Sequence, residues 1–282
     1  MLLDRIVWRK LFSAWRFLPS FCALALSVFV VVSWTSNGSA SQAIADQYPA
    51  SLLYSKPVEV IPNVWSAIGQ TGPSTYENAG HNNNLSFIVT QEGVVVVNGG
   101  GSYLLAQALH QEIKAITDQP VRLVIDENGQ GHAMLGNAYW GEQGVKILAH
   151  EDAASNFEER GHTILESARS RLKDRAAGTE VRLPDETFSD RRVLQMGDVT
   201  FEQLDALYVI PGHGHPTNMD QVRRYTLDYL TDLRARIAEH IEKGGGLEDA
   251  YYVDQSRWQH LDTFEELATR NAGRVFEVME FE

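Results

Sequence analysis

A short apolar strand followed directly by a polar loop and the start of a helix is the feature that most constrains this chain. Residues 121–125 (VRLVI) are mainly apolar and β-branched, residues 126–131 (DENGQG) have turn composition, and residues 133–140 (AMLGNAYW) are compatible with a helix. In α/β proteins, a polar loop at the carboxyl end of a buried strand commonly carries the functional residues. The sequence therefore predicts an α/β fold with candidate functional residues in this loop.

Alternating strands and helices extend to both sides of the loop. The glycine-rich residues 98–102 predict a tight turn between a strand and a helix, with Ser102 as the helix N-cap. The helix that follows presents its apolar residues on one face. The pattern predicts further strands at residues 145–149, 193–194 and 199–201, helices at residues 103–116 and 152–177, and a loop at residues 184–190.

The motifs in these elements resemble, in the same order, those of the metallo-β-lactamase superfamily. Residues 63–69, 84–90 and 94–97 resemble three successive strands of the family. Residues 135–137 (LGN) match the tail of the family's metal-binding loop, and residues 98–102 resemble its D-x-G-x-S turn, with asparagine where aspartate is usual. Residues 208–214 resemble the late strand whose loop carries the last metal-ligating histidine, here His213. The series covers roughly residues 58–216, and the resemblance implies an αββα sandwich and a zinc-dependent hydrolase.

Several of the family's metal ligands have no counterpart in this sequence. In the T-H-x-H-x-D-H loop, the two early histidines align with Asn128 and Gln130, the aspartate with His132 and the last histidine with Ala133. A Q-G-H form of this loop is similar to one branch of the superfamily. The H-x-x-G-D motif of the middle segment is absent from the sequence. The sequence therefore predicts a sandwich that is truncated in its second half.

Two histidines are the strongest candidate metal ligands. His132 and His213 lie on loops that the resemblance places opposite each other at one edge of the sheet, with Gln130, Asp126 and His215 as helpers. A catalytic zinc needs about three protein ligands and an open position for water, so any zinc is expected to bind weakly or not at all. The alternative is structural: His132 caps the following helix, and His213 packs under a proline–glycine turn.

One further histidine is a candidate for substrate binding. His81 lies in the polar segment GHNNN, before a strand that would flank the same cleft. The alternative is a loop histidine exposed to solvent.

The N-terminal residues have the pattern of a secretory signal peptide. A basic segment precedes the apolar run at residues 17–34, and residues 43–45 (AIA) form a cleavage site of small residues. Cleavage would release the protein to the periplasm or the exterior; an uncleaved membrane anchor is the alternative. Cys22, the only cysteine, lies within the apolar run, so the exported domain would contain no disulfide.

The charge and the C-terminal pattern complete the predicted organisation. A net charge of −13 argues against nucleic acid as a partner. Apolar residues at helical spacing predict helices over residues 219–241 and 263–280, with Asn218 as an N-cap, and the first helix is expected to cover an edge of the sheet. The predicted domains are a signal peptide (1–45), a metallo-β-lactamase-like domain (46–216) and a C-terminal helical extension (217–282).

Three functional interpretations remain open at this stage. The resemblance implies an exported metal-dependent hydrolase acting on a small molecule, with activity weakened or lost because ligands are missing. A non-catalytic binding or accessory protein would keep the fold without the metal. A degraded gene product would fold poorly, because missing core strands expose edges and apolar faces. The substrate and the oligomeric state stay undetermined.

Overall fold

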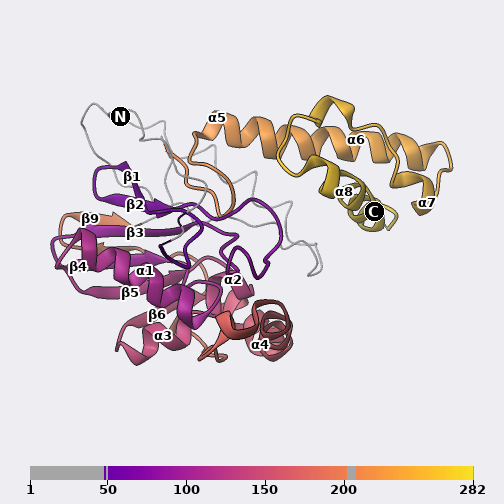
Figure 1. Cartoon of the computed structure of the whole chain (residues 1–282). Coiled ribbons are helices and arrows are strands. Elements are labelled where there is room, and N and C mark those ends of the chain that lie inside the picture. Colours follow the sequence, from indigo (N-terminus) through magenta and orange to yellow (C-terminus); the bar gives the residue numbers. More distant parts are fainter. Residues whose placement is uncertain (1–47, 49, 202–207, 282) are drawn as a thin grey trace, which may run out of the picture.

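The computed structural model describes residue 48, residues 50–201 and residues 208–281 (Figure 1). The predicted signal peptide, residues 1–45, lies outside these ranges. Within them, no helix has both the length and the apolar character that crossing a membrane requires.

A mixed sheet of seven strands in sequential order forms the centre of the first part of the chain. The strands are β1 (Val58–Ile61), β2 (Val64–Ala67), β3 (Leu85–Thr90), β4 (Gly93–Val97), β5 (Val121–Asp126), β6 (Lys146–His150) and β7 (Glu186–Phe188). Strands β1 to β4 pair antiparallel, and β4 to β7 pair parallel. The carboxyl ends of the parallel strands therefore meet at one edge of the sheet, where α/β proteins place their sites.

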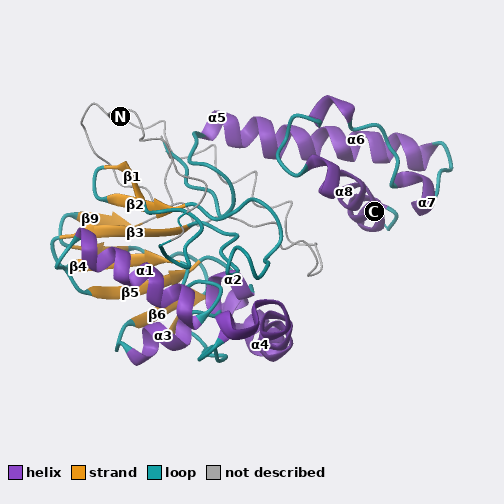
Figure 2. Ribbon diagram, viewed as in Figure 1, coloured by secondary structure: helices purple, strands orange, loops and turns teal. Residues whose placement is uncertain are grey.

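Helices cover one face of this sheet and a small second sheet covers part of the other (Figure 2). Helices α1 (Tyr103–Ile116) and α3 (Asn137–Glu142) pack on the first face, while α2 (Gly131–Met134) and α4 (Glu151–Leu172) share a neighbouring apolar cluster. On the second face, strands β8 (Leu194–Met196) and β9 (Val199–Phe201) pack against alternate residues of β3, β4 and β5. The predicted α/β class is confirmed, and the large sheet with its reduced partner agrees with a metallo-β-lactamase-type sandwich that is truncated in its second half.

Close backbone packing explains the glycines of the two motifs beside β4 and β5. The Gly136 N–H donates to the Gly100 carbonyl at 2.7 Å, and a Cβ atom on Gly136 would lie 2.0 Å from the Gly99 carbonyl oxygen. The buried Trp140 donates its Nε1–H to the same Gly99 carbonyl at 2.9 Å. Ser102 accepts a hydrogen bond from the Leu105 N–H at 3.1 Å, so the predicted N-cap is confirmed.

Two sequence predictions in the later part of this domain were wrong. The predicted loop at 184–190 contains strand β7, whose pairing with β6 is reinforced by the ion pair between Lys146 and Glu186. The predicted late strand at 208–214 is a loop with one isolated bridge, between Val209 and Thr217. This bridge makes two backbone hydrogen bonds and does not extend into a strand.

The C-terminal helices form a cluster with its own core (Figure 1). The elements are α5 (Met219–Val222), the π-helical segment η2 (Arg223–Asp228), α6 (Tyr229–Glu242), α7 (Leu247–Ala250), the 3-10 turn η3 (Ser256–Trp258) and α8 (Phe264–Met279). Asn218 accepts a hydrogen bond from the Gln221 N–H at 3.0 Å, so the second predicted N-cap is also confirmed. The expectation that the helix at 219–241 covers the sheet was wrong, because the buried side chains of α6 pack on α7, η3 and α8.

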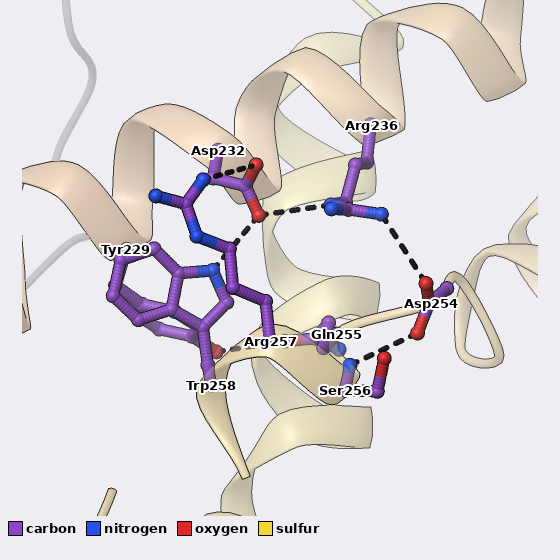
Figure 3. A network of polar contacts seen from close by, with 8 residues as sticks. All are labelled: Tyr229, Asp232, Arg236, Asp254, Gln255, Ser256, Arg257 and Trp258. Carbon is purple, nitrogen blue, oxygen red and sulfur yellow. Dashed lines mark hydrogen bonds and ion pairs between the residues drawn. The ribbon is translucent and has the colours of Figure 1, made fainter. Parts of the chain in front are cut away.

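A polar network joins α6 to the segment before α8 (Figure 3). Asp232 Oδ2 accepts hydrogen bonds from Arg236 Nε and Trp258 Nε1, both at 2.8 Å. The Tyr229 hydroxyl donates to Gln255 Oε1 at 2.9 Å beneath this pair. These bonds satisfy the polar groups at the edge of the C-terminal core. They also tie α6 to the segment that precedes α8.

Candidate functional site

The two histidines singled out from the sequence lie in contact. The imidazole centroids of His132, in α2, and His213, in the loop after Val209, are 5.0 Å apart with an interplanar angle of 84°. The structural alternative for His132 was wrong, because Gln130 is the N-cap residue of α2 and makes no side-chain capping bond. His213 is exposed, and the alternative of packing under a turn was also wrong.

Neighbouring amides set the orientation of both rings. His213 Nδ1 lies 2.5 Å from the Asn82 carbonyl oxygen, which can only accept, so Nδ1 is the donor of this hydrogen bond. His132 Nε2 lies 3.4 Å from Asn128 Nδ2, an amide donor, so Nε2 accepts. Burial, and secondarily His213, lower the pKa of His132 to about 4. His132 is therefore neutral at physiological pH.

An asparagine that sequence reasoning overlooked holds the His213 loop in place. The buried Asn84 donates through Nδ2 to the carbonyls of Pro211 at 2.8 Å and Gly214 at 2.6 Å, and its Oδ1 accepts from the Gly69 N–H at 3.1 Å. Its backbone N–H donates to the Gly212 carbonyl at 2.7 Å. Only a carboxamide supplies both the donors and the acceptor, so the position of His213 depends on this side chain. The run of three asparagines before β3 was the available signal.

The two acidic residues at the end of β5, the buried Asp126 and the half-buried Glu127, contact different neighbours. Asp126 accepts from the Gly99 N–H at 3.0 Å and from Asn137 Nδ2 at 2.8 Å, on the side of α3. The carboxylate of Glu127 lies against the His213 loop, where a Cβ atom on Gly212 would be 2.7 Å from Oε1. Burial raises the pKa of each to about 7, against hydrogen bonds that lower it. Glu127, rather than Asp126, is the acid beside the histidines.

The remaining candidates occupy distinct places. Gln130 lies in the loop between β5 and α2, where its N–H donates to Asn128 Oδ1 at 2.8 Å. His215 is exposed. His81 is fully buried, so the expectation of a solvated loop histidine was wrong. Its Nδ1 accepts from the Tyr54 N–H at 2.7 Å, and burial lowers its pKa to about 4. The bond from the Tyr54 N–H holds the His81 ring inside the fold.

A cleft of about 340 Å³ opens beside His132. The loop before β3, the loop between β5 and α2, and one face of α4 form its walls. Its volume is in the range of pockets that hold small molecules. The lining residues are Ser74, Gly80, Asn82, Gly101, Gly129, Gln130, Gly131, His132, Leu135, Asn156, Arg160, Ile164, Ala168, Arg171 and Leu172.

The described residues do not make up a zinc site of the kind that the resemblance implies. Among residues 48, 50–201 and 208–281, no three or more His, Cys, Asp or Glu side chains are arranged to hold a metal ion. A catalytic zinc takes about three protein ligands, and His132 and His213 supply two. His132 Nε2 is moreover engaged by Asn128. The pair can contact a ligand, but it does not by itself fit zinc.

Comparison with known proteins gives partial matches among solved structures. A metallo-β-lactamase from Pontibacter korlensis is 20% identical, covers 52% of this chain and 58% of its own, and has a TM-score of 0.38. Metallo-β-lactamases from Erythrobacter litoralis (14% identity, 42% and 49% coverage, TM-score 0.33) and Pseudomonas aeruginosa (FIM-1 in its mono-zinc form; 18%, 37% and 46%, 0.32) also match. No family model and no curated protein matches. The chain spans about half the length of these structures, which belong to the family whose motifs its sequence resembles.

Proposed function

We propose that this protein binds a small molecule in the cleft beside His132 and His213, and that metal-dependent hydrolysis by it is weak or lost. The observation that carries the proposal is the meeting of the two imidazoles, 5.0 Å apart, next to a cleft of about 340 Å³. The neutral His132 ring lines that cleft and offers a polar contact in a partly apolar wall. A few polar groups in an apolar pocket are what orients small ligands.

A second candidate is a hydrolase with a single, weakly held zinc ion. It is favoured by His213, whose Nδ1 donates a hydrogen bond to the Asn82 carbonyl, so that Nε2 is the nitrogen left for another contact. This arrangement is typical of metal-ligating histidines, whose second nitrogen bonds a carbonyl or carboxylate. The two candidates predict different rates of turnover.

We expect the purified protein to hydrolyse a chromogenic β-lactam and p-nitrophenyl esters far more slowly than ordinary enzymes, which turn over at about 1–10³ per second. Any residual rate should be abolished by His132→Ala and by His213→Ala, because both rings meet at the site. His162→Ala, an exposed histidine of α4 that does not line the cleft, is the control and should leave the rate unchanged. Turnover at an ordinary rate, dependent on added zinc, would favour the second candidate.

We also propose that the protein is exported and cleaved near residue 45, because a basic segment, an apolar run and an A-x-A site follow one another at its N-terminus. N-terminal sequencing of periplasmic material from an expressing bacterium should begin within a few residues of Asp46. Recovery of the full-length chain in the membrane fraction would instead support an anchor.

A further inference from the structure

We infer that the cleft selects a small molecule that carries an oxyanion, such as a carboxylate, on an apolar body. This inference rests on the proposed binding function and adds the class of ligand to it. Its basis is the stripe of α4 that faces the cleft, formed by Asn156, Arg160, Ile164, Ala168 and Arg171. The spacing of these residues, three or four apart, places them on one side of the helix.

Arginine side chains bring positive charge to a protein that is otherwise strongly acidic. Arg160 has no hydrogen-bond or ion-pair partner in the described part of the chain, and Arg171 uses Nη1 to donate to Ser167 Oγ at 2.5 Å. In contrast, Arg169 on another side of the same helix is paired with Glu166 at 3.0 Å. The two guanidinium groups at the cleft therefore keep N–H donors for a ligand.

The acidic residues of α4 face away from the cleft. No aspartate or glutamate is among the described residues that line it. With a net charge of −13, the molecule as a whole repels anions, so a local patch without acids is needed to admit one. A guanidinium binds a carboxylate through two parallel N–H bonds, which gives both affinity and orientation.

Between the two arginines the wall is apolar. Ile164 and Ala168 of α4 lie between them in the sequence and line the cleft, together with Leu172 and with Leu135 at the end of α2. All four belong to one apolar cluster. Arg160 and Arg171 are eleven residues apart, which is about 16 Å along a helix. A ligand whose apolar body lies along this wall would place its oxyanion at either Arg160 or Arg171. The single variants Arg160→Gln and Arg171→Gln identify which arginine binds it.

The test measures binding of 4-phenylbutyrate and octanoate, and of their uncharged amides, by isothermal titration calorimetry. In the unmodified protein each carboxylate should bind at least about tenfold more tightly than its amide, because bonds to charged groups are the stronger ones. The double variant Arg160→Gln, Arg171→Gln should bind acid and amide equally. Arg122→Gln, which removes one exposed charge near the amino end of β5, should keep the preference.

The outcomes separate the two proposals. Equal binding of acids and amides to the unmodified protein, or a preference that survives in the double variant, would overturn the anion inference and leave the binding cleft standing. If none of the four compounds bound, the binding function would fail together with the inference.

Discussion

Replacing Asn84 with leucine should lower the free energy of unfolding by about 2–4 kcal/mol and displace the His213 loop. The substitution keeps the volume but removes the donors to the Pro211 and Gly214 carbonyls and the acceptor for the Gly69 N–H. Asn84 is 3% exposed, so water cannot replace these bonds without opening the structure. Urea unfolding monitored by tryptophan fluorescence gives the change in stability.

A matched control distinguishes the loss of any carboxamide from the loss of the Asn84 carboxamide. Gln111→Leu makes the same chemical change on the exposed side of α1, and its effect should stay within about 0.5 kcal/mol. If the two variants were equally stable, Asn84 would not hold the loop in solution.

The buried Asp126 should make stability fall with rising pH between about pH 4 and 7. Burial raises its pKa from 3.8 to about 7 in the folded protein, in spite of hydrogen bonds from Asn137 and Gly99. In this window the folded state binds more protons than the unfolded state. The contribution of Asp126 to the free energy of unfolding is therefore largest at low pH and is lost as pH rises through 7. The neutral His81 and His132, with pKa values of about 4, act in the opposite direction below pH 6.5. Glu127, whose pKa burial also raises to about 7, acts in the same direction as Asp126. The histidines therefore cancel only part of the fall in the stability of the whole protein.

Asp126→Asn isolates the effect of this carboxyl group. The Oδ1 atom of Asn137 is buried without a partner, so rotation of that amide lets an asparagine at 126 keep both hydrogen bonds. Relative to the unmodified protein, the variant should gain on the order of 2 kcal/mol between pH 5 and pH 8. Urea midpoints at the two pH values measure this gain, and Asp118→Asn, at an exposed position after α1, is the control. A stability difference that did not change with pH would contradict the buried, proton-binding state of Asp126.

The sequence predicted the parts of this fold that depend on local patterns. Short apolar runs identified β5 and β6, the resemblance identified β3 and β4, and apolar residues at helical spacing identified α1. Capping residues located the starts of α1 and α5. The resemblance predicted that the loops of His132 and His213 lie at the same edge of the sheet, and the two rings are in contact there.

The parts that escaped prediction depend on contacts between segments far apart in the chain. Strand β7 has a polar sequence, and its strand conformation comes from pairing with β6. The role of Asn84 becomes visible only when the loop at 211–214, some 130 positions away, lies against it. His81 looked exposed because its neighbours are polar, yet its burial results from the backbone that folds over it. The packing of α6 was misjudged because an amphipathic pattern does not specify its partner.

Metal content is the most direct test of the central claim, that His132 and His213 meet beside the cleft without forming a complete zinc site. Elemental analysis of the purified, dialysed protein should find less than one zinc ion per chain, because the described residues supply two of the roughly three protein ligands that a catalytic zinc needs. His132→Ala and His213→Ala should each remove whatever zinc remains. Two zinc ions retained per chain after dialysis would contradict the account and would require ligands beyond His132 and His213.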